Sequence, residues 1–210
     1  MKTSSWLFWN VDTQIDFVEP EGKLYVEGAE QLKPVWKEIK LLAEKHQIHV
    51  VNTADFHWPG SNELSETPDF ISTFPPHCMA NTEGAEYVEE TQPENALVVN
   101  WDKPFKFNSE QIKNNRNIVI RKDAFDVFSG NPYTSAIVEK LSPETVIIYG
   151  VTTNVCVNDA VEGLSQRVKN VLVIEDAIKE LPNIPLPFEN WQKIGVKMIQ
   201  LSELEEILEN

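Results

Sequence analysis

The chain has 210 residues, of which 41% are hydrophobic, and this is enough to build one domain with a sizeable core. Its 33 acidic and 18 basic residues give a formal net charge of −15, which argues against nucleic acid and anionic membranes as partners because both would repel it. We therefore expect a single domain over residues 1–210 that acts on a small molecule or a protein.

The N-terminal segment reads MKTSSWLFWNVDTQ, and Asn10 and Asp12 interrupt its apolar run, which argues against a signal peptide or a transmembrane segment. Cys78 and Cys156 are the two cysteines of the chain, too few for a disulfide framework. Both observations are typical of a cytoplasmic protein.

Short apolar runs alternate with amphipathic stretches along the chain, and runs of this continuous kind predict buried strands of a parallel sheet. The runs cover residues 6–11, 48–53, 117–122, 145–150 and 170–176, with 196–201 as a further candidate. Helical spacing of apolar residues predicts helices within 29–46, 132–141 and 154–168. Pro34 either lies in the first turn of its helix or kinks it. The alternation predicts an α/β fold, a three-layer sandwich around a mostly parallel sheet.

Ligands of such sheets bind at the carboxyl ends of the strands, and side chains of reactive types gather there in this sequence. Asp12 follows the first strand, Lys122 ends the third, and Cys156 follows the fourth. The loop after the second strand carries Asp55, His57, Glu63 and His77. We therefore expect the functional site at this edge of the sheet.

Cys156 has two interpretations. A helix that begins near Thr153 or Asn154 would place the thiol in its first turn, where free backbone N–H groups favour a thiolate nucleophile. Alternatively, Cys156 is a small apolar side chain that packs the helix on the sheet. Asp12 is placed to accept the thiol proton. Lys122 either pairs with Asp12 or the thiolate, or extends its ammonium to the surface.

The loop after the second strand suggests a metal site. Asp55 and His57 project to the same side of an extended stretch, and Glu63 and His77 follow in a loop rich in Pro, Gly and Ser. Two imidazoles and two carboxylates fit Zn²⁺, Fe²⁺ or Mn²⁺, with open positions for water or a substrate atom. By spacing alone, two ordinary histidines in a surface loop fit equally well.

Five motifs in chain order, VDTQIDF, TADFHWPG, TPDFISTFPPHC, VIRKDAFDVFSGNP and GVTTNVCVNDAV, resemble those of the isochorismatase-like cysteine hydrolases. Within this family they resemble the nicotinamidase, or pyrazinamidase, branch. The resemblance implies a catalytic triad of Asp12 as base, Lys122 as its electrostatic partner and Cys156 as nucleophile. It also implies a cis peptide between Val151 and Thr152, which would direct the backbone N–H groups of Thr152 and Cys156 at the oxyanion.

The same resemblance implies that Asp55, His57 and His77 bind a metal ion that holds the pyridine nitrogen of the substrate. Glu63 stands where most members have histidine, and as a fourth ligand it would make the site more negative. We expect one divalent transition metal, Zn²⁺ first, with Fe²⁺ and Mn²⁺ as alternatives. The family also has a flat substrate slot, and the matching positions here are Phe17, Leu24, Phe74, Phe128, Val151 and Val155.

Residues 95–116 contain no family motif, and we expect an insertion there within the single domain. It would form a hairpin, a cover at the site or a subunit contact, so a homo-oligomer stays open.

The interpretation is a metal-dependent amidase that converts nicotinamide to nicotinate and ammonia, a reaction of NAD salvage, through a thioester on Cys156. One alternative is a hydrolase of another small amide or a carbamoyl compound. Another is a non-catalytic binding or assembly module, against which the intact triad argues.

Overall fold

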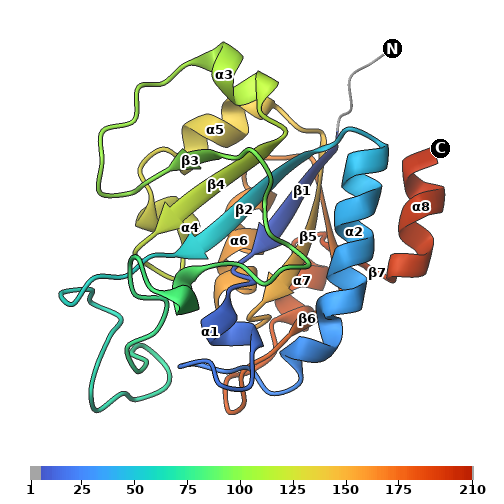
Figure 1. Ribbon diagram of the computed structural model, residues 1–210. Helices are drawn as coiled ribbons and strands as arrows, with labels where there is room; N and C mark the ends of the chain where they lie inside the picture. The colour runs from blue at the N-terminus through green and yellow to red at the C-terminus, as the bar shows by residue number, and fades with distance from the viewer. Residues whose placement is uncertain (1–5, 210) are drawn as a thin grey trace.

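The computed structural model describes residues 6–209, so the first five residues of the N-terminal segment and residue 210 lie outside it. One sheet runs through the described chain in the order β3-β4-β2-β1-β5-β6-β7, and every neighbouring pair is parallel (Figure 1). The strands are β1 (Trp6–Val11), β2 (His49–Asp55), β3 (Leu97–Val99), β4 (Asn117–Lys122), β5 (Thr145–Val151), β6 (Asn170–Lys179) and β7 (Lys197–Ile199). This architecture confirms the predicted α/β fold with a parallel sheet.

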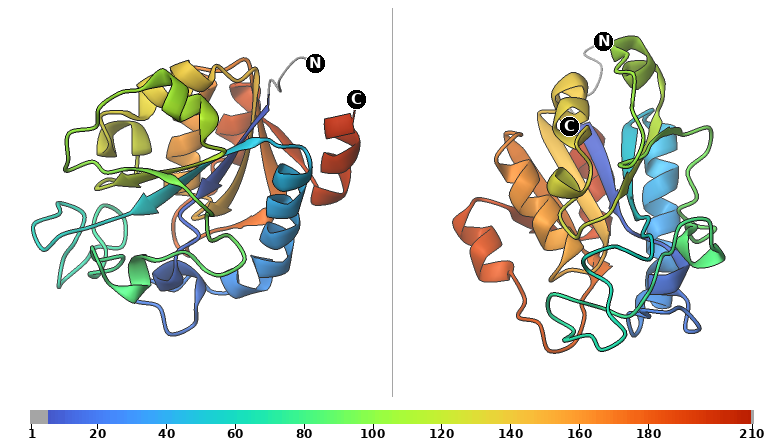
Figure 2. Two further views of the ribbon diagram at one scale, coloured as in Figure 1. Left: turned by 45° about the horizontal axis from the view of Figure 1, so that its top comes forward. Right: turned by 90° about the vertical axis from the view of Figure 1, so that its left-hand side faces the viewer.

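Helices cover both faces of the sheet (Figures 1 and 2). Helices α2 and α8 pack on one face, and α4, α5 and α6 pack on the other. The helices are α1 (Ile15–Val18), α2 (Lys33–Lys45), α3 (Ser109–Asn114), α4 (Val127–Gly130), α5 (Thr134–Leu141), α6 (Cys156–Ser165), α7 (Phe188–Lys193) and α8 (Leu201–Glu209), with short 3-10 helices η1 (Ala29–Leu32) and η2 (Glu83–Ala85). The layers therefore form the predicted sandwich.

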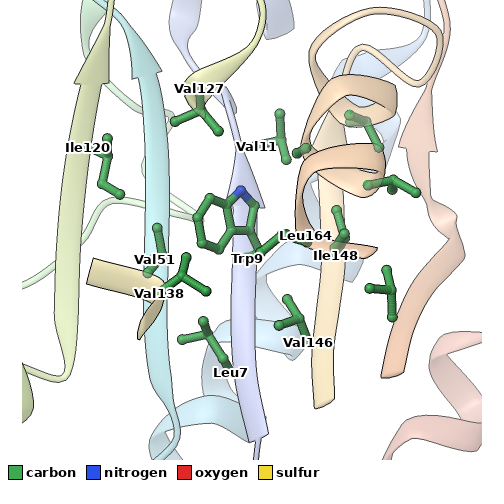
Figure 3. Packing of buried hydrophobic residues seen from close by; sticks show 14 of the residues in the cluster. Leu7, Trp9, Val11, Val51, Ile120, Val127, Val138, Val146, Ile148 and Leu164 are labelled. Atoms are coloured by element: carbon green, nitrogen blue, oxygen red, sulfur yellow. The ribbon is translucent and has the colours of Figure 1, made fainter. Parts of the chain in front are cut away.

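Burial on both faces explains why the strand sequences are continuously apolar. In β1, Leu7, Trp9 and Val11 belong to the core under α5 and α6, as Figure 3 shows around Trp9. Phe8, which points to the opposite face, belongs to the core under α2 and α8. Because successive side chains of a strand alternate between faces, each face needs its own set of apolar residues.

Several predicted elements differ from the structure in their bounds. Pro34 lies in the first turn of α2 and does not kink it. The helix predicted from about Thr153 begins at Cys156. Residues 95–116 form β3, an irregular connection and α3, and β3 runs parallel to β4, so the expectation of a hairpin is wrong. The sequence patterns did not predict β3 or the C-terminal helix α8.

The carboxyl ends of β4, β2, β1 and β5 meet at one edge because these strands are neighbours in the sheet. Gly150 lets β5 pass close to the end of β1: its φ is 120°, and a Cβ there would lie 2.1 Å from the carbonyl oxygen of Val11. The register with β6 shifts between Ile148 and Gly150. The peptide between Val151 and Thr152 is cis, as predicted, and the chain then enters α6.

Candidate active site

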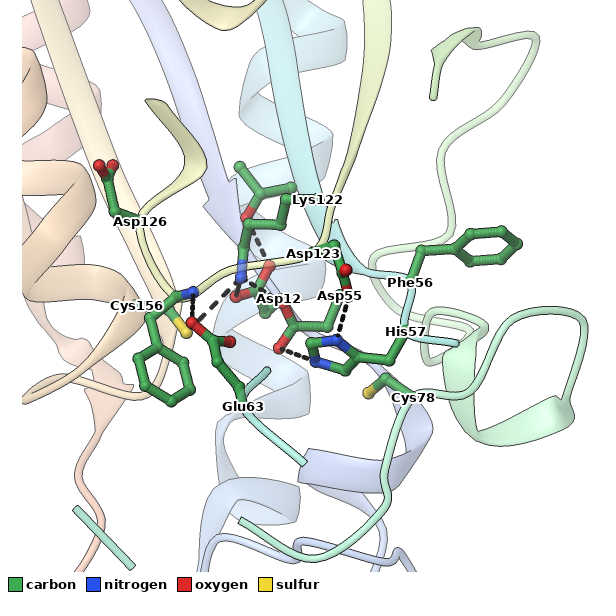
Figure 4. A network of polar contacts seen from close by, with 12 residues as sticks. Asp12, Asp55, Phe56, His57, Glu63, Cys78, Lys122, Asp123, Asp126 and Cys156 are labelled. Carbon is green, nitrogen blue, oxygen red and sulfur yellow. Dashed lines mark hydrogen bonds and ion pairs between the residues drawn. The ribbon is translucent and has the colours of Figure 1, made fainter. Parts of the chain in front are cut away.

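Lys122 is the central group at this edge (Figure 4). Its ammonium, at the end of β4, lies 3.0 Å from Asp12 Oδ2 and 3.7 Å from Cys156 Sγ, and it also pairs with Asp55 at the end of β2. The side chains of Lys122, Asp12 and Asp55 are at most 1% exposed. The attraction between the buried ammonium and the two buried carboxylates offsets the free energy that all three groups lose when they leave water. Lys122 therefore does not extend to the surface.

Burial governs the protonation of this group. Burial lowers the pKa of Lys122, but the charges of Asp12 and Asp55 outweigh it and hold that pKa well above its usual range. Burial raises the pKa of Asp12 against the opposing charge of Lys122. Burial also raises the pKa of the Cys156 thiol, even though Lys122 opposes it and α6 begins there. This direction runs against the expectation of a ready thiolate and favours a thiol that gives its proton to a base.

Three of the four predicted metal ligands come together. Ligand atoms of Asp55, His57 and His77 lie within 4.8 Å of one another, and Nε2 of each histidine is 3.7 Å from Asp55 Oδ2. Ligands about 2.1 Å from a tetrahedral metal ion lie roughly 3.4 Å apart, so this spacing fits an ion between them. Within residues 6–209, Asp55 Oδ2 and His57 Nε2 are buried without a hydrogen-bond partner. The donor set and its unpaired atoms therefore fit a divalent metal.

Glu63, the fourth predicted ligand, stands outside this group. Its Oε1 accepts a hydrogen bond of 2.7 Å from the backbone N–H of Phe125, which joins the loop after β2 to the loop after β4. Burial raises the pKa of Glu63 to about 7, and the hydrogen bond from Phe125 opposes this only in part. The carboxylate thus holds a loop in place, which the family pattern of ligands did not indicate.

The metal-ligand segment is fixed by side chains that sequence reasoning did not single out. The Gln14 side chain accepts from the Asp55 N–H and donates to the Asp55 carbonyl, each at 2.8 Å. Trp101 Nε1 donates to the Phe56 carbonyl at 3.0 Å. Gln14 lies inside the first motif, VDTQIDF, and this position is the signal that could have pointed to it. Trp101 comes from the segment expected to be an insertion and gave no such signal.

A narrow pocket that opens to solvent lies beside these groups. Its lining residues are Phe17, Leu24, Asp55, Phe74, His77, Phe125, Thr152, Val155, Cys156 and Leu181. Four of the predicted slot residues are among them. Phe128 and Val151 are not: Phe128 stacks on Trp9 at 6.2 Å between ring centroids with Arg167 over its face, and Val151 is wholly buried in the core. Phe125 and Leu181 line the pocket in their place.

Thr152 and Cys156 both line this pocket. Within residues 6–209, no backbone carbonyl accepts from the N–H of either residue, which leaves both donors free for an oxyanion. The Thr152 hydroxyl is buried and has no partner in the same part of the chain. Both cysteines are free thiols. No helix of the described residues is long and apolar enough to cross a membrane.

The chain resembles known proteins in sequence. A family model described as the isochorismatase domain matches residues 6–184. A nicotinamidase/pyrazinamidase of Mycobacterium tuberculosis (strain ATCC 25618 / H37Rv) is 38% identical over 77 residues, which make up 37% of this chain and 40% of that protein. The chain therefore matches well under half the length of this relative.

The fold resembles solved structures over nearly the whole chain. N-carbamoylsarcosine amidase from Thermoplasma acidophilum superposes with a TM-score of 0.73 at 19% identity, over 95% of this chain and 98% of that one. The pyrazinamidase of Pyrococcus horikoshii in complex with zinc superposes with a TM-score of 0.69 at 23% identity, over 93% and 99% of the two chains. At these identities the structures demonstrate a common fold alone.

Proposed function

The chain belongs to the isochorismatase family of hydrolases, and on this premise we propose that it is a metal-dependent amidase that converts nicotinamide to nicotinate and ammonia. Asp12, Lys122 and Cys156 form the proposed catalytic triad. The proposed metal ligands are Asp55, His57 and His77. The product nicotinate would then enter NAD salvage.

One observation carries the proposal: a single narrow pocket is lined both by Cys156 and by two members of the metal-ligand group, Asp55 and His77. A small flat ring in that pocket would reach the thiol and the metal position together. Phe17 and Phe74 line the same pocket, each with its ring edge-on to His77 at 5.2 and 6.5 Å between centroids. Aromatic walls of this kind suit a planar heteroaromatic amide.

The chemistry follows from the positions of the triad. Asp12 takes the thiol proton as Cys156 Sγ attacks the carboxamide carbon, and the raised pKa of Asp12 strengthens it as a base. The backbone N–H groups of Thr152 and Cys156 stabilise the negative charge on the amide oxygen. The C–N bond breaks as Asp12 returns the proton to nitrogen, and ammonia leaves. Water then hydrolyses the thioester to give nicotinate and the free thiol, so one water is consumed for each amide.

The metal-ligand residues would orient the substrate. A bound divalent ion would supply a Lewis-acid site for the lone pair of the pyridine nitrogen. Asp55 and the two histidines would hold Zn²⁺, with Fe²⁺ and Mn²⁺ as alternatives that the same donors accept. Lys122 stays charged and pairs with Oδ1 of Asp55, so the second oxygen of Asp55, Oδ2, faces the two histidines. In this arrangement the ring nitrogen and the carboxamide carbon are placed at once.

A second candidate is a hydrolase of another small amide or carbamoyl compound. Thr152 favours it, because this residue lines the pocket and its buried hydroxyl, unpartnered within residues 6–209, would hydrogen-bond a substrate with a further polar atom beside the scissile bond. A plain heteroaromatic carboxamide has fewer such atoms to offer. The substrate test must therefore compare amides that differ in one atom.

Steady-state ammonia release from nicotinamide, pyrazinamide and benzamide tests the proposal. Pyrazinamide keeps a ring nitrogen at the coordinating position and should be hydrolysed. Benzamide has the same shape without that nitrogen, and it should lose about two orders of magnitude in kcat/KM if a metal bond of roughly 3 kcal/mol is forfeited. Equal rates for benzamide and nicotinamide would favour the second candidate. Purified active protein should also carry about one transition metal per chain.

A further inference from the structure

Asp123 directly follows Lys122 and accepts hydrogen bonds from three side chains of the loop after β2, those of His57, Trp58 and Ser61. We propose that Asp123 is a positioning residue that fixes His57 as a metal ligand. The inference rests on the metal site of the proposed function and adds to it a residue of the fourth motif, VIRKDAFDVFSGNP, to which the sequence analysis gave no role.

The hydrogen bond from His57 determines which ring nitrogen is available. Nδ1 of His57 lies 2.8 Å from Asp123 Oδ1, and a carboxylate can only accept, so Nδ1 carries the proton. The lone pair of the neutral ring is then on Nε2, which is buried, unpaired within residues 6–209 and 3.7 Å from Asp55 Oδ2. Asp123 therefore sets both the tautomer and the direction of the ligand atom.

The second histidine is held by a weaker kind of partner. His77 Nδ1 donates to the backbone carbonyl of Pro75 at 2.8 Å, which fixes the same tautomer with a neutral acceptor. A charged acceptor makes a stronger hydrogen bond and a more basic ligand than a carbonyl does. His57 should therefore depend on its outer partner more than His77 does, and that partner is a side chain that can be substituted.

Asp123 also couples the metal-ligand group to the triad through the backbone. Lys122 contacts Asp12, Asp55 and Cys156, and the next residue along the chain holds His57. Two consecutive residues at the end of β4 thus place the nucleophile and the metal ligand. Figure 4 shows both side chains reaching into the network from this one strand end.

A purely structural role for Asp123 is the rival explanation. Trp58 Nε1 donates to Asp123 Oδ2 at 3.2 Å and Ser61 Oγ donates to Oδ1, so the carboxylate also closes the turn from Trp58 to Ser61. If closing that turn were its whole role, removing the Ser61 donor would have the same effect as changing Asp123. If Asp123 positions His57, the change at Asp123 should weaken metal binding more than the change at Ser61.

The test measures the Zn²⁺ and Mn²⁺ affinity of the full-length metal-free protein by competition with a chromophoric chelator. D123N keeps one acceptor oxygen but turns an NH₂ group toward the remaining donors, and it should weaken metal affinity by about 10- to 100-fold. D126N is the matched control, because Asp126 lies apart from the network in Figure 4 and caps α4, a role that Asn also fills. D126N and S61A should both stay within about threefold of the wild type.

The outcomes separate this inference from the proposed function. Wild-type protein that binds neither ion would overturn both. Wild-type affinity in D123N, or an equal loss in D123N and S61A, would overturn the role of Asp123 and leave the amidase intact. If D123N does not fold, D123E restores the carboxylate, and recovery of metal affinity by D123E alone supports the positioning role. Alkylation of Cys156 by iodoacetamide should proceed at the wild-type rate in D123N, since the triad is untouched.

Discussion

The proposed triad and the proposed metal-ligand group lie at the same edge of the sheet, but different kinds of structure hold them. Asp12, Lys122 and Cys156 stand at the ends of β1 and β4 and at the start of α6, where the parallel ladder and two layers of core fix the backbone. His57 and His77 stand in the long connection between β2 and β3, whose regular structure is one short 3-10 helix and isolated bridges. The triad is therefore held by packing, and the two histidines of the metal-ligand group by individual hydrogen bonds, whereas Asp55 ends β2.

This difference determines how each region should respond to substitution. A residue on a strand end can be changed without moving its backbone, so its loss should remove chemistry and leave the fold. A ligand in the loop depends on side chains outside its own segment, such as Gln14 and Asp123. The two regions meet in the ion pair of Lys122 with Asp55. A substitution there should therefore affect both the fold and the metal-ligand group.

The largest effect is expected at Cys156, the proposed nucleophile. Cys156→Ala should lower ammonia release from nicotinamide by about four orders of magnitude or more, because the thioester cannot form, and Asp12→Asn should come close to it by removing the base. Urea unfolding of the alanine variant should match the wild type closely, since α6 and the core remain. Near-normal turnover by Cys156→Ala would contradict the mechanism. Cys78→Ser, which changes the other buried thiol, is the control and should remain active.

The ion pair between the two regions gives the next largest effect. Lys122→Met leaves the buried carboxylates of Asp12 and Asp55 without their cation and should cost about 3–5 kcal/mol in the free energy of unfolding. Zn²⁺ should then stabilise the variant more than it stabilises the wild type, because the ion becomes the nearest cation to Asp55. Urea titrations with and without the metal measure both effects. Lys106→Met changes an exposed lysine and should alter neither.

The central strands, which are buried on both faces, could be predicted from the sequence. The strands at 6–11 and 117–122 are confirmed residue for residue, because burial on both faces produces a continuous apolar run. The edge strand β3 was missed, since it has three residues and Val98 is exposed. The grouping of Asp55, His57 and His77 came from the family resemblance, because spacing alone did not distinguish ligands from ordinary loop histidines.

The loop-held parts of the site could not be predicted, and two pairs of residues explain why. Phe125 and Phe128 are three positions apart, and the Asp126 cap of α4 turns Phe128 onto Trp9 while Phe125 faces the pocket. The local sequence pattern does not indicate which of the two rings lines the pocket. Likewise, Glu63 aligns with a ligand position, but its Oε1 accepts from the Phe125 N–H, a partner 62 residues away in sequence.

The two phenylalanines provide a smaller, paired test of the pocket. Phe125→Leu removes a ring that lies edge-on to Phe74 at 5.5 Å, and KM for nicotinamide should rise about five- to tenfold as roughly 1 kcal/mol of aromatic contact is lost. Phe128→Leu should leave KM unchanged and lower the free energy of unfolding by about 1 kcal/mol, because its ring packs on Trp9. Steady-state kinetics of both variants measures KM, and urea unfolding measures their stability. The opposite assignment would mean that Phe128 lines the slot.

The smallest effect concerns Glu63 and depends on pH. Burial raises its folded pKa from 4.5 to about 7, so the protonated form contributes stability that is fully present below the unfolded pKa and is lost as pH rises through about 7. Glu63→Gln stays neutral and still accepts from the Phe125 N–H. The free energy of unfolding of the variant should therefore match that of the wild type at about pH 4.5 and exceed it at about pH 8. The difference should be only about 1 kcal/mol, because solvent screens this partly exposed group.

Urea unfolding of the metal-free proteins across this pH range measures the difference, and Glu66→Gln, at an exposed position of the same loop, should show none. The same variant tests the role that the family pattern would give to Glu63. Because its carboxylate stands outside the group of Asp55, His57 and His77, Glu63→Gln should change Zn²⁺ affinity by less than about threefold. A loss comparable to that of a true ligand would show that Glu63 turns toward the ion when metal binds, and that the loop is less firmly held than its hydrogen bond to Phe125 indicates.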